Sequence, residues 1–150
     1  MCSLRRINQN IQSSNFEANR MGVKTWTMVK KMLTDKDPEV RQYGAITCSN
    51  RIYTHAKRFE ALIPLWQDKH ESVRWCVADS LGLIGDERAI EPLVSMLDDQ
   101  SETVRISAAH ALGEIGDNRA IEPLTSKLDS QSEKMKKAVI SSLERIEEER

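Results

Sequence analysis

Apolar side chains recur every three or four residues along most of the chain, which is the pattern of helices that bury one face. The clearest case is the stretch from Ser72 to Ile84, which predicts a helix. Its expected buried stripe consists of Val73, Val77, Ala78, Leu81 and Ile84. Gly85 follows directly, and glycine readily adopts the left-handed conformation in which many helices end. The polar positions between the stripe residues are therefore expected to face solvent.

The same pattern occurs again 31 residues later along the chain. Of the 31 residues from Val73 to Thr103, 20 recur unchanged at that distance. A fixed period of this length is typical of a solenoid, in which each unit stacks on its neighbours because it cannot bury its apolar face alone. We expect each unit to consist of a first (A) helix and a second (B) helix.

The helix pattern extends the repeat in both directions. It predicts A helices at Lys24–Leu33 and Phe59–Asp68, and further A helices that contain Pro92 and Pro123. It predicts B helices at Pro38–Ile52, Ser72–Ile84 and Val104–Ile115, and a last one that begins near Glu133. Residues 24–150 are therefore expected to form one solenoid domain. Residues 1–23 are expected to form an N-terminal cap helix, with Leu4, Ile7 and Ile11 on one stripe, and a connection.

Several helix ends carry specific signals. Asp37 is expected to cap the first B helix, with Pro38 in the first helical position. The pair Gly85-Asp86 recurs as Gly116-Asp117, and each pair is expected to end one helix and open the next unit. The stretch Asn50–Arg58 departs from the repeat and is expected to be an inserted loop that contains His55.

The stretches VRWCVADSLGLIGDERAIEPL, from Val73, and VRISAAHALGEIGDNRAIEPL, from Val104, resemble the HEAT-like repeats of the phycobilisome-lyase type. The unit of that family reads roughly D-x-x-x-V-R-x-x-A-A-x-A-L-G-x-I-G-D-x-x-A-I-x-P-L. The resemblance is strongest from Val73 to Leu128 and extends over about Lys24 to Ile146. It implies an all-α fold, a right-handed α/α superhelix of about four helix pairs whose B helices line the concave face. It also implies, as one alternative, an accessory role in a bilin lyase, in which the chain would hold a tetrapyrrole or its protein carrier.

Positions on the B helices that do not define the repeat are free to carry function. The outward positions are expected to be Gln42, Tyr43, Ile46 and Asn50, then Trp75, Cys76, Asp79 and Leu83, then Ile106, Ser107, His110 and Glu114, then Lys137, Ala138, Ser141 and Arg145. A solvent-facing tryptophan among aliphatic side chains is typical of an interaction site. The predicted binding residues are Tyr43, Ile46, Trp75, Asp79, Leu83, Ile106, His110 and Glu114. In the alternative interpretation, Trp75 packs against the next unit or against a self-associating copy of the chain.

Arg41, Arg74 and Arg105 recur just after the turn between the helices of a unit, each with an aspartate upstream. These aspartates are Asp37, Asp68, and Asp98 or Asp99. The pattern favours a structural ladder of ion pairs that joins the turns of adjoining units. A row of anion-binding arginines is disfavoured, because an acid accompanies every arginine.

Charge and cysteine content narrow the function further. The chain has 22 basic and 23 acidic residues, a balance that argues against a nucleic-acid binder. Three cysteines without a CxxC spacing indicate free thiols in a reducing compartment. The first ten residues lack the apolar core of a signal peptide, and no apolar run is long enough to cross a membrane. We therefore expect a cytoplasmic protein.

Residue patterns for catalysis are weak. The positions at which some HEAT-repeat enzymes bind two irons hold Gln42-Tyr43, Trp75-Cys76 and Ile106-Ser107 here. Asp79, His110 and Ser141 share one slot of successive B helices, but stacked helices lie about 8–10 Å apart, too far for a catalytic triad. Asp79 and His110 are therefore expected to be a polar pair on the surface. A metal site from Asp79, His110 and Glu114 is also disfavoured.

The sequence thus predicts a non-catalytic scaffold with no cofactor. Its expected partner is another protein or a second copy of the chain, and a bilin chromophore remains the alternative. A basic cluster on the first A helix, around Lys30 and Lys31, is expected to be a solvated outer face.

Overall fold

The computed structural model describes residues 22–48, 53–129 and 132–148, and this part of the chain is helical without a strand. The α-helices are α2 (Gly22–Leu33), α3 (Pro38–Cys48), α4 (His55–Leu62), α5 (Glu71–Ile84), α6 (Ile90–Met96), α7 (Glu102–Ile115), α8 (Ile121–Thr125) and α9 (Glu133–Glu148). Short 3-10 turns at Ile63–Leu65, Glu87–Ala89 and Asn118–Ala120 extend α4 and precede α6 and α8. The predicted N-terminal cap helix lies outside the described residues.

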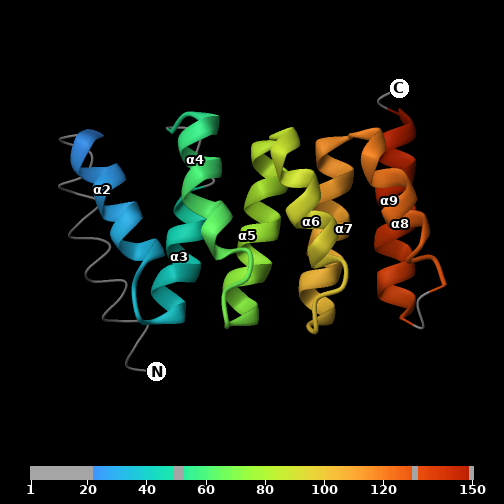
Figure 1. Ribbon diagram of the computed structural model, residues 1–150, viewed down its shortest axis with the longest axis horizontal. Helices are drawn as coiled ribbons and strands as arrows, with labels where there is room; N and C mark the ends of the chain where they lie inside the picture. Colours follow the sequence, from blue (N-terminus) through green and yellow to red (C-terminus); the bar gives the residue numbers. More distant parts are fainter. Residues whose placement is uncertain (1–21, 49–52, 130–131, 149–150) are drawn as a thin grey trace.

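The helices form four stacked pairs, α2/α3, α4/α5, α6/α7 and α8/α9. In Figure 1 the pairs follow one another in chain order along the long axis of the molecule. The B helices α3, α5, α7 and α9 each contact the next B helix directly, and each A helix packs on the B helix of its own unit. The fold is therefore the predicted all-α superhelix of four helix pairs.

The predicted helix ends are confirmed. Gly85 and Gly116 have φ angles of 69° and 72°, so both end their helices in the left-handed conformation. A carboxylate oxygen of Asp37 accepts a hydrogen bond from the backbone N–H of Glu39 at 2.9 Å, at the start of α3. Asp86 caps the next unit in the same way. These signals are local, which explains why the sequence predicts them well.

Two predictions around the insertion are wrong. The second A helix begins at His55, four residues earlier than predicted, and gives way to a 3-10 turn that contains Pro64. The cause is Thr54, whose hydroxyl oxygen accepts a hydrogen bond from the backbone N–H of Lys57 and caps a new first turn. His55 therefore lies in a helix and not in a loop. The predicted extension of α3 from Cys48 to Ile52 lies outside the described residues.

The predicted arginine ladder is confirmed, but its rungs join different residues. The guanidinium of Arg41 donates two hydrogen bonds to the carboxylate of Asp68 in the next unit, at 2.7 and 2.9 Å. Arg74 binds Asp99 in the same two-pronged way, at 2.6 and 2.8 Å. The remaining nitrogen of Arg74 donates to the backbone carbonyl of Asp68, in its own turn. Arg41 and Arg74 thus each close their own turn and also bridge to the turn that follows, whereas Arg105 donates to backbone carbonyls of its own turn and forms no ion pair within the described residues.

The ladder is buried. The side chains of Arg74 and Asp99 are only 7% and 11% exposed. Burial opposes ionisation of Asp99, but the hydrogen bonds from Arg74 and from the backbone N–H of Ser101 outweigh it and lower its pKa. The pKa of Asp68 is lowered for the same reasons, with Arg41 and the N–H of His70 as donors. The rungs are therefore structural ion pairs that are ionised at neutral pH.

Glycines set the distance between neighbouring B helices. A Cβ atom added at Gly82 would lie 2.8 Å from the Cα of Ala111, on the facing helix. A Cβ atom added at Gly113 would lie 2.8 Å from the Cβ of Ser142. Such distances are shorter than ordinary carbon contacts. Glycine at 31-residue spacing therefore lets α5, α7 and α9 approach one another closely and fixes the spacing of their outer surfaces.

Two thiols are sealed in the stack. Cys48 and Cys76 are free and buried, and burial raises the pKa of each to about 11. At pH 8 only about 0.1% of such a thiol is the reactive thiolate. In a Cys2→Ser variant, we expect almost no reaction with Ellman's reagent while the protein is folded, and two thiols per chain in urea. Rapid reaction of two thiols in the folded state would contradict this burial.

Candidate functional site: the B-helix face

One stripe of α5 points away from the A helices. Helical geometry places positions 71, 75, 79 and 83 on one side, opposite the buried stripe that contains Val73 and Leu81. The exposure of the side chains agrees with this geometry, since all four residues are exposed: Glu71, Trp75, Asp79 and Leu83. Trp75 is 37% exposed and Leu83 is 61% exposed. Trp75 is therefore not sealed inside the stack.

The neighbouring B helices present equivalent stripes. On α3 the exposed residues include Tyr43 and Ile46, the latter 51% exposed. On α7, His110 and Glu114 are exposed and Ile106 is half-buried. All eight residues predicted to bind therefore reach the surface of α3, α5 and α7. We call this surface the B-helix face, made of Tyr43, Ile46, Trp75, Asp79, Leu83, Ile106, His110 and Glu114.

Three residues expected to point outward do not do so. Cys76, Ser107 and Ala138 are buried. They occupy one repeat position, directly after that of Trp75. In α3, the first B helix, the same position holds Tyr43, which is exposed. Asn50, which was also expected to face outward, lies outside the described residues.

The polar groups of the B-helix face do not form a catalytic arrangement. Asp79, His110 and Ser141 are all exposed, and no hydrogen bond or ion pair joins them within the described residues. Asp79 and His110 are thus both exposed on the B helices, as predicted, but they are not bonded to each other. Glu114 forms an ion pair with Arg145 of α9. No group of three or more metal-ligating side chains lies together in the described part of the chain.

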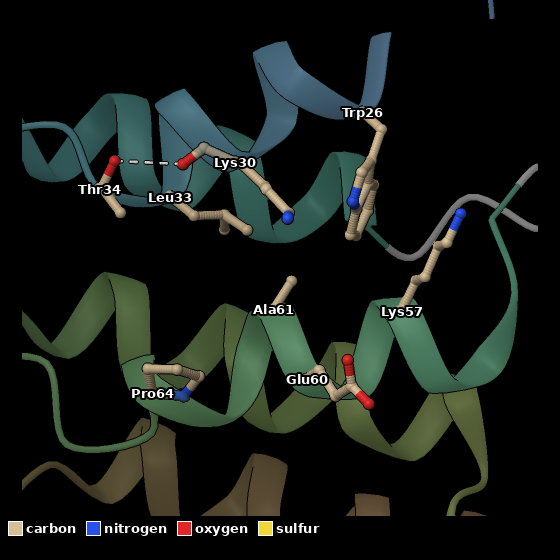
Figure 2. Close-up of a pocket in the computed structure, with 8 residues that line it drawn as sticks. All are labelled: Trp26, Lys30, Leu33, Thr34, Lys57, Glu60, Ala61 and Pro64. Atoms are coloured by element: carbon tan, nitrogen blue, oxygen red, sulfur yellow. Dashed lines mark hydrogen bonds between the residues drawn. The ribbon is translucent and has the colours of Figure 1, made fainter. Parts of the chain in front are cut away.

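A pocket of about 480 Å³ lies on the other layer, between α2 and α4. Figure 2 shows its eight lining residues, which are Trp26, Lys30, Leu33, Thr34, Lys57, Glu60, Ala61 and Pro64. The side chain of Lys30 extends into the pocket beside the ring of Trp26. Glu60 lines the pocket on the opposite side, from α4. The sequence did not predict this pocket, because it depends on the unexpected start of α4. Its volume suits a small ligand, but its charges are of both signs and do not select one.

The stacked pairs and their buried inter-unit ladder define an α-solenoid of the HEAT and armadillo class. The family of HEAT repeats matches residues 27–112 and 90–150, so the chain belongs to the HEAT-repeat family. No curated protein matches the sequence. None of the helices in the described segments has the length and apolar character needed to cross a membrane.

Solved structures share the fold. The complex of CpcE and CpcF of phycocyanin lyase from Nostoc sp. PCC7120 superposes with a TM-score of 0.72 at 22% identity, over 81% of this chain and 53% of that chain. Human deoxyhypusine hydroxylase in complex with glycerol gives 0.68 at 24% identity, over 83% and 44%. A designed armadillo repeat protein in complex with peptide (KR)4 gives 0.62 at 23% identity, over 79% and 62%. The chain thus spans about half of the length of the two natural proteins. At these identities the similarity shows the fold alone.

Proposed function

We propose that the chain is a non-catalytic interaction module that binds a segment of another protein through the B-helix face. One observation carries the proposal. Among the described residues, every large hydrophobic side chain that is exposed lies on a B helix: Tyr43, Ile46, Trp75, Leu83 and Ile140. Four of the five lie on the adjacent helices α3 and α5 and belong to the B-helix face, whereas Ile140 of α9 lies outside it. Apolar side chains gathered on one face of a soluble protein are typical of an interaction site.

Rigidity supports the proposal. The B helices are held in register by the buried Arg41–Asp68 and Arg74–Asp99 pairs and by the glycine contact at Gly82. A surface that is ordered before binding loses little conformational entropy when a partner docks. The aromatic side chains Tyr43 and Trp75 are the residue types that most often dominate binding energy.

The test compares variants in a pull-down from a lysate of the source cells. Trp75→Ala is expected to weaken capture of the partner at least about 30-fold, the usual effect of removing a dominant aromatic contact. Ile46→Ala and Ile140→Ala form a matched pair, because the two isoleucines are 51% and 46% exposed but only Ile46 belongs to the B-helix face. Only Ile46→Ala is expected to weaken capture. Native circular dichroism with unaltered capture by Trp75→Ala and Ile46→Ala would contradict the proposal.

An accessory role in a bilin lyase is the second candidate, and its support is the repeat resemblance and the shared fold with a phycocyanin lyase complex. In that case the apolar side chains around Trp75 would hold a tetrapyrrole. Titration with a bilin, followed by absorbance, separates the two candidates. A saturable spectral change that is lost in Trp75→Ala would favour the lyase role, and an unchanged spectrum would exclude chromophore binding by this face.

A further inference from the structure

The charges exposed on the first three B helices have one sign. The exposed charged side chains of α3, α5 and α7 are Glu39, Glu71, Asp79, Glu102 and Glu114, and all are acidic. The arginines of these helices do not offset them. Arg41 and Arg74 are buried in the ladder, and Arg105 is half-buried and donates to the backbone carbonyls of its own turn. The described surface of α3, α5 and α7 is therefore apolar and acidic.

The acids border the apolar side chains in an ordered way. On α5, Glu71 precedes Trp75 and Asp79 follows it, each at a distance of four residues, or about 6 Å along the helix. On α7, Glu102 lies four residues before Ile106. Carboxylates thus lie before both Trp75 and Ile106, and a further carboxylate, Asp79, lies on the other side of Trp75. A segment docked across the helices at Trp75 would meet acids along its edges.

Within the described residues, only one of these five carboxylates, that of Glu114, forms an ion pair. Glu114 is neutralised by Arg145, but neither Asp79 nor Glu71 forms an ion pair within the described residues. The exposed lysines of the first two units lie on the A helices, namely Lys30 and Lys31 of α2 and Lys57 of α4, and in the turns before α3 and α5, namely Lys36 and Lys69. The two layers of the solenoid therefore differ in charge in this region.

A partner that covers Trp75 must also remove water from Asp79, which lies one turn away on the same stripe. Burying a carboxylate without a partner costs free energy. A neutral or acidic segment would therefore lose much of the binding free energy that the apolar contact with Trp75 provides. A cationic side chain at that point compensates the lost hydration. The same arrangement disfavours acidic partners through like-charge repulsion.

We propose that the occupant of the B-helix face is a cationic amphipathic segment of another protein, with apolar side chains against Trp75 and its neighbours and a lysine or arginine against Asp79. This inference rests on the proposed function and specifies the chemistry of the partner. The segment carries basic residues on both sides of its apolar stripe, to meet Glu71 and Glu102 on one side and Asp79 on the other.

The experiment uses a library of random 12-residue peptides displayed on phage, selected on the immobilised full chain. Selected peptides are then synthesised, and their affinities are measured by fluorescence anisotropy. We expect sequences that combine aromatic or aliphatic residues with two or more lysines or arginines, and affinities that fall as salt rises. Asp79→Asn is expected to weaken binding about tenfold and to reduce the salt dependence. Glu122→Gln, an exposed acid of α8 on the other layer, serves as the matched control and is expected to change little.

Reversing the charges of the peptide and of Asp79 tests whether the two attract each other. A peptide in which the basic residues are replaced by glutamate is expected to lose affinity for the wild type and to regain part of it with Asp79→Lys. Peptides that require Trp75 and Ile46 but are neutral or acidic, or are indifferent to Asp79→Asn, would overturn this inference and leave the proposed function standing. Peptides that bind Trp75→Ala and wild type equally would overturn the proposed function itself. A dimer in sedimentation that disappears with Trp75→Ala would identify a second copy as the occupant and would also overturn the inference.

Discussion

Replacing Arg74 by methionine is expected to lower the free energy of unfolding by about 3 kcal/mol, because it leaves the buried carboxylate of Asp99 without its counterion. Methionine keeps much of the aliphatic length of arginine, so the loss reports the charge and its hydrogen bonds. The pair joins the second unit to the third, and both side chains are almost fully buried. Urea unfolding followed by circular dichroism measures the change, which corresponds to about 6–12 °C in Tm.

The matched control is Arg119→Met. Arg119 also binds an aspartate through two nitrogens, but that aspartate is Asp117 in its own turn, its second partner Glu87 of the preceding unit lies 3.4 Å away, and its side chain is 58% exposed. Exposed pairs contribute little because water screens them. We therefore expect this variant to unfold almost like the wild type. Equal losses in the two variants would contradict the claim that burial makes the Arg74–Asp99 pair the stronger one.

The Arg74–Asp99 pair also predicts how the free energy of unfolding depends on pH. The pKa of Asp99 is lowered in the folded protein, so its ionised form adds stability that is present above about pH 4, the pKa of an unfolded aspartate. That stability is lost as the pH falls through the lower pKa of the folded state. The difference between wild type and Arg74→Met is therefore expected to be largest near neutral pH and to shrink in acid. A difference that is constant from pH 7 to pH 3 would contradict the assignment.

Gly82→Ala is expected to destabilise the protein by about 2 kcal/mol, although alanine in the interior of a helix is normally preferred over glycine by about 1 kcal/mol. The added Cβ atom would meet the Cα and Cβ of Ala111 at 2.8 and 2.9 Å, so α5 and α7 must move apart. Thermal unfolding measures the loss. A double variant with Ala111→Gly is expected to recover part of it, because the two residues are in direct contact.

Ser141→Ala provides the control for this prediction. Ser141 is an exposed residue of α9, where alanine gains helix propensity without a steric cost. This variant is expected to be as stable as the wild type or slightly more so. If Gly82→Ala also raised the stability, the close packing of the B helices would not be set by this glycine.

The repeat period made much of the fold predictable. Twenty identities over 31 residues indicated stacked helix pairs, and local signals such as Asp37 and Gly85 set the helix ends. The exposed stripe at Trp75, Asp79 and Leu83 followed from helical geometry alone. Such features depend on residues that are close in sequence, so they can be predicted from a single amino-acid sequence.

Other features depend on how one unit sits on the next, and the sequence did not reveal them. Each arginine had an aspartate in its own turn, but the turns stack so that Arg74 meets the aspartate of the following unit, Asp99. The wrong outward assignment of Cys76 has a similar cause, because its burial depends on how α5 packs on α3, where Gln42 lies beside the thiol. Helix spacing is a tertiary property that the helical period alone cannot give.

The central claim is that the B-helix face, and not the A-helix layer, contacts the partner. Hydroxyl-radical footprinting with mass spectrometry tests it directly, because aromatic side chains on both layers report on their own exposure. With partner or selected peptide bound, we expect oxidation of Trp75 and Tyr43 to fall, while oxidation of Trp26 in the α2/α4 pocket stays unchanged. Protection of Trp26 with undiminished oxidation of Trp75 would contradict the account.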